Sequence, residues 1–238
     1  LGTIAVEISA VSESVVVSAA QVEIPLSAAS SSVTVITRDD LEKHQVESVA
    51  DALRAVPGLS VVANGGRGAV TSVFPRGGES DYSLVFVDGV QANAFGGGFD
   101  FAHLPVANIE RIEIVRGPQS ALYGSNAIGS VVRIITRQSG RPDASASLEG
   151  GGFDTFRATA ATSGTVGNWH WGGVTERLTS DNFNGQRTAS GAIVENDDYE
   201  RSSATAAGGW RNSQGAALQG NVQYGTDERG SPGPFGSD

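Results

Sequence analysis

Polar and apolar positions alternate along the last third of the chain, and this pattern predicts β-strands of roughly 9–12 residues each. The clearest case is Ala217–Tyr224, where Leu218, Gly220, Val222 and Tyr224 share one face and amide side chains occupy the other. One apolar and one amide-rich face suit a soluble sheet and a membrane β-barrel equally. The expected strands are residues 143–151, 154–163, 168–178, 199–210 and 215–224.

The lengths and connections of these segments favour the barrel. A tilted strand needs roughly 9–11 residues to cross a bilayer, and barrels combine short turns with long outer loops. Two long connections are expected here, Ser180–Asp198 and Gly225–Asp238. Tyr199 and Trp210 are an odd number of residues apart, so a bulge or an inward-facing Tyr199 is needed to reconcile them. The aromatic residues near expected strand ends, where interfacial aromatics are common, are Trp169, Trp171, Tyr199, Trp210 and Tyr224.

One segment of the middle region carries a helical pattern. Thr37 and Asp40 fit a capping box, the arrangement that begins many helices. The sequence Pro57-Gly58 ends the pattern, because proline lacks an N–H and glycine permits a reversed backbone. We therefore expect a single helix between these signals. The apolar residues that would form its buried face are Val46, Val49, Ala50, Leu53 and Val56.

Short strand patterns bounded by glycine surround this helix. Val85–Val90 contains Asp88-Gly89, a dipeptide that favours a tight hairpin turn. The middle region is therefore expected to be a mixed α+β domain. Its predicted strands are Val33–Thr37, Leu59–Ala63, Leu84–Val87, Ile109–Val115 and Val131–Thr136.

Composition excludes several classes of function. The formal charge is −10 and cysteine is absent, which argues against a basic nucleic-acid surface, thiolate metal sites and cysteine nucleophiles. The three histidines are scattered, and no phosphate loop or serine nucleophile elbow occurs. We expect no enzymatic activity and no cofactor. Because the chain begins at Leu1 without a basic leader, we expect it to start inside a longer protein.

The middle region resembles the plug domain of TonB-dependent outer-membrane receptors. The segments that carry the resemblance are Ile36–Leu41, Asp51–Leu59, Leu84–Val90, Leu104–Gly129 and Val131–Thr136. The resemblance implies a plug inside a 22-stranded barrel that imports scarce nutrients with energy from the inner membrane. It places the protein in the outer membrane of a Gram-negative-type bacterium.

This resemblance divides the chain into three parts. Residues 1–32 form an extended N-terminal segment, and residues 33–140 form the plug domain. Residues 141–238 form the first, incomplete strands of the barrel. The expected fold class is an α+β plug followed by the first antiparallel strands of a transmembrane β-barrel.

Within the family, the stretch from Asn64 to Phe101 looks most like cobalamin receptors. A cobalamin-like corrinoid is therefore the first candidate ligand, a ferric siderophore the second, and a glycan or peptide an alternative. A secreted all-β adhesion or structural module is the alternative from another class. Pro75 and Arg133 depart from the family pattern, and Pro75 puts local strand pairing in doubt because proline cannot donate to a ladder.

The family's TonB box has a counterpart in the N-terminal segment. An uncharged, β-branched peptide can add a strand to the sheet edge of a periplasmic energy-coupling partner of the TonB type. An ordinary linker strand is the other interpretation. The residues expected to bind this partner are Ser14, Val15, Val16, Val17 and Ser18.

Two glycine-rich plug loops, 64–72 and 91–99, are expected to face the outside and form the floor of the ligand site. Glycine lets the backbone approach a bulky ligand closely. The candidate contacts in these loops are Asn64, Arg67, Gln91, Asn93 and Phe95.

Two further groups of charged residues are singled out by the expected fold. Arg76 and Arg116 would be shielded from water inside a barrel, so we expect carboxylate partners on barrel strands; a solvent-facing turn is the alternative. Asp181, Asp197 and Asp198 could supply oxygen ligands to calcium, although a solvated loop explains them as well.

Overall fold

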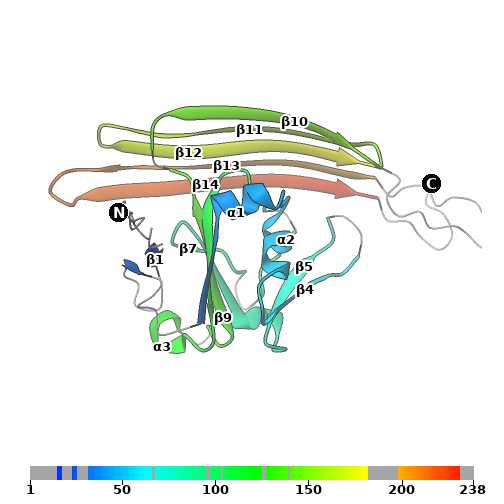
Figure 1. Ribbon diagram of the computed structural model, residues 1–238, viewed down its shortest axis with the longest axis horizontal. Helices are drawn as coiled ribbons and strands as arrows, with labels where there is room; N and C mark the ends of the chain where they lie inside the picture. Colours follow the sequence, from blue (N-terminus) through cyan, green and yellow to red (C-terminus); the bar gives the residue numbers. More distant parts are fainter. Residues whose placement is uncertain are drawn as a thin grey trace, which may run out of the picture.

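The computed structural model describes residues 15–17, 23–25, 32–65, 68–94, 97–102, 104–124, 127–138, 140–181 and 198–230. Two bodies lie against each other (Figure 1). A broad antiparallel sheet, β10–β14 (the outer sheet), covers one side of a smaller mixed domain formed by residues 32–138 (the plug region).

The plug region is built on a five-stranded sheet in the order β3-β8-β9-β6-β7. β6 and β9 run parallel, and the other pairs are antiparallel. All the predicted strands of this sheet are present, with bounds that differ by a residue at most. The predicted strands are β3 (Ser32–Thr37), β6 (Ser83–Val87), β8 (Ile109–Arg116) and β9 (Ser130–Thr136). The two-residue strand β7 (Val90–Gln91), which was not among the predicted strands, completes the sheet.

The predicted single helix is wrong, because two short helices occupy that segment. α1 covers Arg38–Lys43 and α2 covers Val49–Arg54. Gln45 between them has a φ of 49°, which interrupts the helical path. The hydroxyl of Ser48 then accepts a hydrogen bond from the Asp51 amide at 3.2 Å and begins the second helix. No helix in the described residues is long and apolar enough to cross a membrane.

The predicted capping box at Thr37 is present. The Asp40 amide donates to the Thr37 hydroxyl at 3.3 Å, and the Thr37 amide donates to the Asp40 carboxylate at 3.0 Å. The Thr37 hydroxyl also donates to that carboxylate at 2.6 Å. These bonds, the hydroxyl's above all, favour the ionised carboxylate and lower the pKa of Asp40.

Thr37→Ala is expected to lower the free energy of local opening of α1 by about 1 kcal/mol at neutral pH. Because the pKa of Asp40 is lower in the folded state, the stability from its ionised form is lost as the pH falls through that pKa. The difference between Thr37→Ala and the parent protein should therefore shrink in acid. Amide hydrogen exchange in α1 measures it. Asp39→Asn, an exposed neighbour, is the control and should show a smaller effect.

A second hairpin and the two helices complete the plug region. β4 (Leu59–Ala63) pairs with β5 (Thr71–Pro75), and they form a sheet of their own. Pro75 is the last residue of β5, opposite Leu59, so the expected difficulty with strand pairing falls at the end of a ladder. The core between helix α2 and the five-stranded sheet is formed mainly by Leu53, Val85, Ile112, Ile114, Val132 and Ile134.

Short elements surround this core. The 3₁₀ turn η2 covers Ser80–Tyr82 and α3 covers Ser120–Tyr123. α3 lies at the end of the plug region farthest from the outer sheet (Figure 1). In the N-terminal segment, β1 (Val15–Val17) pairs with β2 (Glu23–Pro25).

The outer sheet contains all five predicted long strands in sequence order. Its last strand is longer than predicted, because residues 225–229 continue the ladder opposite Tyr199–Ser203 and do not begin a loop. The other predicted loop, Ser180–Asp198, is described only at its ends. Ser180 is the last residue of β12, and residues 182–197 lie outside the described residues. The strands are β10 (Asp143–Gly151), β11 (Thr155–Val166), β12 (Trp169–Ser180), β13 (Tyr199–Arg211) and β14 (Ala217–Arg229).

The two faces of the outer sheet differ in chemistry. Val174, Glu176 and Leu178 of β12 are buried against the plug region, so Trp169 and Trp171 point away from it. Leu218 and Val222 share this outward face through their pairing with Trp210 and Ala206. The inward amides of β14 meet the plug: Gln219 donates to Gln138 Oε1 and Asn221 donates to the Val87 carbonyl, both at 3.5 Å. The predicted alternation of β14 is confirmed.

Tyr199 resolves the mismatch in aromatic positions. It is 2% exposed and faces the plug region, as do Arg201 and Ser203 on the same strand. Trp210 lies on the opposite face, directly beside Trp169 of β12. Tyr199 is therefore an inward residue, and no bulge is needed.

Candidate functional site

A polar cavity of about 490 Å³ lies between the plug region and the outer sheet. It sits at the end of the sheet that carries the 152–154 turn, Asp181 and Asp198, which we call the loop end. The plug contributes the start of α2, Gly65 and Gly68 of the β4–β5 loop, and Thr71 at the start of β5. The sheet contributes inward side chains of β11, β12 and β13: Arg157, Leu178, Tyr199 and Arg201.

Charges of alternating sign cross the inner face of the outer sheet beside this cavity. Arg157 of β11 donates to Glu149 of β10 at 3.2 Å, and its Nε lies 3.9 Å from Glu176 of β12. Arg201 of β13 donates to Glu176, and Asp227 of β14 is its register partner. Glu176 is 5% exposed, and its two arginine partners offset the free-energy cost of burying its charge.

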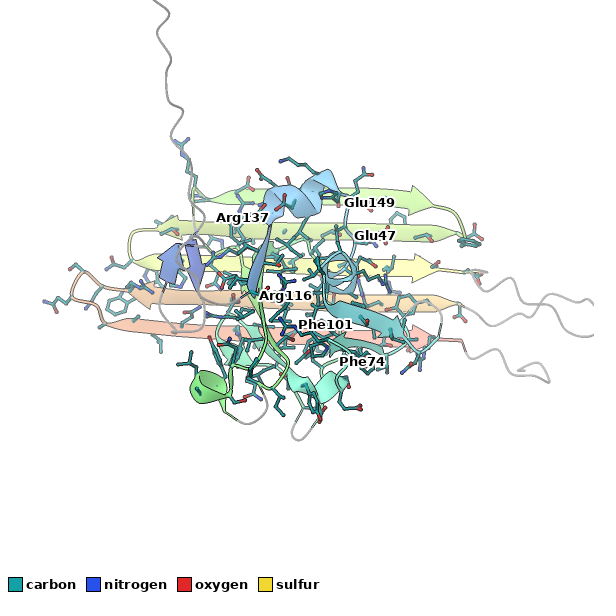
Figure 2. The ribbon with its side chains drawn as sticks, turned by 60° about the horizontal axis from the view of Figure 1, so that its bottom comes forward. Glu47, Phe74, Phe101, Arg116, Arg137 and Glu149 are labelled. Atoms are coloured by element: carbon teal, nitrogen blue, oxygen red, sulfur yellow. The ribbon has the colours of Figure 1, made fainter. Side chains whose placement is uncertain are left out.

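Two groups of the plug region bind this row of charges. Glu47, in the connector between α1 and α2, accepts from Arg157 Nη2 at 2.7 Å. The Ala102 carbonyl accepts from Arg201 Nη1 at 3.0 Å. Figure 2 shows Glu47 and Glu149 next to each other over the loop end of the sheet. The row therefore connects the plug to the sheet as well as strand to strand.

Tyr199 and Gly68, which both line the cavity, fit closely together. A Cβ at Gly68 would overlap the ring of Tyr199, and Gly68 has a φ of 76°. The phenol ring therefore rests on bare backbone of the β4–β5 loop. The Tyr199 hydroxyl is buried and has no hydrogen-bond partner in the described structure. The Nε atom of Arg201 is also buried without a hydrogen bond in the described structure, and Arg157 Nε has only the 3.9 Å approach to Glu176.

The first predicted ligand loop lies at this cavity. Asn64 is exposed at the end of β4, and its amide donates to the Val70 carbonyl at 3.0 Å, which closes the β4–β5 loop. Arg67 lies outside the described residues. The loop's contribution to the cavity comes mainly from backbone at Gly65 and Gly68, as glycine-rich loops favour.

The second predicted loop lies elsewhere. Gln91 lines a smaller, largely apolar cavity of about 230 Å³ between β7 and strands β12–β14. The Asn93 side chain is bound to the backbone of β6: its oxygen accepts from the Val85 amide at 2.7 Å and its nitrogen donates to the Ser83 carbonyl at 2.9 Å. Phe95 lies outside the described residues. The structure does not bring Gln91 and Asn93 together with Asn64.

The two singled-out arginines lie close together in the plug region. Both side chains approach Gly58, where a Cβ would meet Arg76 Cγ at 3.9 Å and Arg116 Cδ at 4.0 Å. Arg116 donates to the Pro57 carbonyl at 2.6 Å and to the Thr34 hydroxyl at 2.8 Å. Within the described ranges neither arginine forms an ion pair, so the expected carboxylate partners stay a prediction.

The predicted partner-binding segment is extended. Val15, Val16 and Val17 form β1 and pair with Glu23–Pro25 of the same chain. The β conformation needed for strand addition is therefore present at these three residues. Ser14 and Ser18 lie outside the described residues.

Two of the three predicted calcium ligands, Asp181 and Asp198, lie in the described residues, and each forms a backbone hydrogen bond at the loop end of the sheet. The Asp181 amide donates to the Phe153 carbonyl, and the Asp198 carbonyl accepts from the Gly230 amide, both at 2.8 Å. Asp197 lies outside the described residues. In the part of the chain that the structure describes, no three His, Cys, Asp or Glu side chains form a metal-binding group. Calcium binding stays a prediction.

Sequence reasoning missed the sheet's contribution to the polar cavity. Arg157, Glu176 and Arg201 each lie in a predicted strand, and each falls on its inward face. A partial signal existed, because charged residues are few in these small-residue strands and each strand contains at least one. Reading it required the register, which the sequence alone does not provide.

The chain is similar to known receptors in both sequence and fold. Residues 25–131 match the family model of the TonB-dependent receptor plug domain. The vitamin B12 transporter BtuB of Vibrio vulnificus (strain CMCP6) is 44% identical over 142 residues, which is 60% of this chain and 23% of that protein. The match thus spans about a quarter of that relative's length.

Solved structures extend the similarity to the outer sheet. The ferripyoverdine receptor of the outer membrane of Pseudomonas aeruginosa matches with a TM-score of 0.71 and 18% identity, over 90% of this chain and 27% of that one. The siderophore receptor PirA from Acinetobacter baumannii matches with a TM-score of 0.60 and 24% identity, over 82% and 31%. At these identities the similarity is one of fold.

Proposed function

We propose that the chain is part of a TonB-dependent receptor, with a plug followed by antiparallel strands like those that begin the barrel of that family, and that the receptor imports a cobalamin-like corrinoid across an outer membrane. A ferric siderophore is the second candidate ligand. The family whose model matches is one of receptors and transporters, which supports a role in transport. The plug match argues against a secreted all-β adhesion module.

One observation supports the corrinoid above other ligands. The 44% identity to a vitamin B12 transporter extends over 142 residues, whereas the ferripyoverdine receptor and PirA match at 18% and 24% identity. The siderophore-receptor matches support the fold but do not distinguish ligands.

The two faces of the outer sheet support a position in a membrane. Leu148, Trp169, Leu218, Val222 and Tyr224 are all more than 60% exposed on the outward face. A soluble protein rarely exposes so many large apolar side chains on one face, while a bilayer would cover them. On the inward face, the plug region buries side chains of the central strands β12 and β13, such as Val174, Leu178 and Tyr199.

The energy source would be a periplasmic coupling protein of the TonB type. β1 supplies an uncharged extended segment ahead of the plug, and strand addition through its backbone would connect the receptor to that protein. The residues proposed for this contact are Ser14, Val15, Val16, Val17 and Ser18.

Uptake in cells tests the proposal. The receptor as its host expresses it should restore uptake of labelled cyanocobalamin to a strain that lacks its own vitamin B12 transporter. Excess unlabelled cyanocobalamin should compete, and ferripyoverdine should not. Uptake of labelled ferripyoverdine alone would establish the siderophore alternative, and uptake of neither would refute both.

Asn93→Ala is expected to weaken cyanocobalamin binding by about 1–2 kcal/mol. The change removes both bonds to β6 and so releases the shape of the second plug loop. Asn93→Asp keeps the acceptor for the Val85 amide and should have a smaller effect. Equilibrium binding in detergent measures both. Unchanged affinity across alanine variants of Asn64, Arg67, Gln91, Asn93 and Phe95 would refute the proposal that plug loops 64–72 and 91–99 bind the ligand.

A further inference from the structure

Two inward residues of the outer sheet hold one glycine of the β4–β5 loop. Tyr199 of β13 and Arg229 of β14 are register partners at the loop end of the sheet. The Tyr199 ring occupies the space that a Cβ at Gly68 would need, and Arg229 donates to the Gly68 carbonyl at 3.5 Å. Because Gly68 also has a φ of 76°, its bare backbone fits against these two side chains where a larger residue would not.

Arg201, on the same face of β13, holds a second plug segment. Its Nη1 donates to the Ala102 carbonyl at 3.0 Å, while its Nη2 donates to Glu176 and so fixes the direction of the guanidinium. Next to Ala102, Phe101 is buried and packs edge-on against Phe99, with 4.8 Å between the ring centroids. Phe99 is the last residue of the second predicted ligand loop, so β13 contacts the surroundings of both loops.

The two plug segments are bonded to each other where the sheet holds them. Asp100 Oδ1 accepts from the Thr71 amide and from the Ala102 amide, both at 2.9 Å. The Phe101 amide donates to the Thr71 carbonyl at 2.9 Å, and the Thr71 hydroxyl donates to the Ala69 carbonyl at 3.0 Å. Thr71 and Phe101 are buried, so water does not compete for these bonds. The two segments therefore behave as one bonded unit.

We propose that Tyr199 and Arg201 are positioning residues of the ligand site: from the sheet, they fix the backbone shape of plug segments 64–72 and 97–102 that binds the ligand. Glycines give the first segment little preference for one conformation, so contacts outside it must select that shape. The ring of Tyr199 does this, because the ring and not the hydroxyl meets Gly68. The inference rests on the proposed function for its ligand, whereas the effect of the sheet on the loops does not.

Amide hydrogen exchange tests the Tyr199 contact without any ligand. In the receptor as its host expresses it, Tyr199→Ala should remove most of the protection of the Asn64 and Thr71 amides, because the loop loses the ring that holds it. Tyr199→Phe restores the ring and should restore the protection. The amides of β8, in the middle of the plug sheet, are the internal reference. Protection retained at Asn64 and Thr71 in Tyr199→Ala, or lost equally in β8, would overturn the proposal.

Arg201→Lys tests the second attachment. Lysine keeps a positive charge beside Glu176, but its single nitrogen cannot occupy both positions of the guanidinium fork. Exchange at the Ala102 amide should therefore become several-fold faster. Arg177→Lys, on the outward face, is the matched control and should leave that amide unchanged. Unchanged protection of Ala102 in Arg201→Lys would overturn the role of Arg201.

A pair of glycines separates the ring contact from backbone strain. Gly77 has a φ of 75°, close to that of Gly68, but no atom lies near the position of its Cβ. Gly68→Ala should weaken cyanocobalamin binding about tenfold, because only molecules with the correct loop shape bind, and Gly77→Ala should weaken it less than about twofold. The double variant Gly68→Ala/Tyr199→Ala should bind no more weakly than Tyr199→Ala alone. Equal losses in the two glycine variants, or additive losses in the double variant, would contradict the proposed contact.

The last measurement separates positioning from direct contact with the ligand. Tyr199→Ala should bind cyanocobalamin about tenfold more weakly than the parent receptor, and saturating cyanocobalamin should restore protection of its Thr71 amide. Tyr199→Phe should recover the parent affinity. Equal losses in Tyr199→Phe and Tyr199→Ala would mean that the hydroxyl binds the ligand and would overturn the positioning role. A parent receptor that does not bind cyanocobalamin would refute the proposed ligand, while the exchange results still decide whether the sheet shapes the loops.

Discussion

Uptake is expected to stop when Val16 is replaced by proline, while ligand binding is expected to remain. Val16 is the central residue of β1, which has the extended conformation used in strand addition. Proline removes the N–H that a partner strand would accept, and backbone bonds carry most of the affinity in this mode of recognition. The ligand cavity lies in another part of the molecule, so it should be unaffected.

Two measurements in cells check this result. Labelled cyanocobalamin is bound to intact cells at low temperature and then followed into them on warming. Val16→Thr is the control, because it keeps both the N–H and the β-branched shape and should preserve uptake. Undiminished uptake by Val16→Pro would contradict the proposal that Ser14–Ser18 bind the periplasmic coupling protein.

In water without detergent, the full 238-residue chain is expected to aggregate, whereas a polypeptide of residues 32–138 should stay soluble. The outward face of the outer sheet has side chains as exposed as Leu148 at 75% and Leu218 at 74%. β10 and β14 form the two edges of that sheet, and unpaired strand edges are templates for association. The plug region encloses its own core between α2 and the five-stranded sheet.

Size-exclusion chromatography distinguishes the two behaviours. The plug polypeptide should elute as a monomer, although more expanded than a rigid globule because the sheet that covers one side of it is missing. Addition of detergent should bring the full chain to a single micelle-bound species. A monomeric 238-residue chain without detergent would refute the membrane-facing role of the outward face and would favour the soluble all-β alternative.

Local sequence signals were sufficient for most of the fold. Strand bounds such as Leu59–Ala63 and Asp143–Gly151 were predicted to the residue, because glycine turns and two-residue alternation fix them locally. The helix was misjudged for a physical reason. Apolar spacing stays in phase when two helices pack on the same core, so Val46, Val49 and Leu53 look continuous across the break at Gln45.

The candidate site was less predictable because it depends on contacts between distant segments. Asn93 was expected to face a ligand, yet its amide is bound to β6, a contact across eight residues that composition cannot reveal. Glu47 meets Arg157 from 110 residues away, through the docking of plug on sheet. The TonB-dependent resemblance indicated the loops, but the side chains that line the sheet's wall required the register.

The link from β9 to β10 limits how the plug can yield when it is pulled. Residues 137–142 reach about 20 Å at most when extended. At the start of this link the Arg137 amide donates to the Asn108 carbonyl at 2.8 Å, and the Arg137 guanidinium pairs with Asp143 at 3.1 Å. At the N-terminal end of the plug region, β3 is an edge strand whose one sheet neighbour among the described strands is β8. A pulling force applied ahead of Ser32 would therefore separate β3 from β8 first, while β9 stays attached to the outer sheet through the contacts of Arg137.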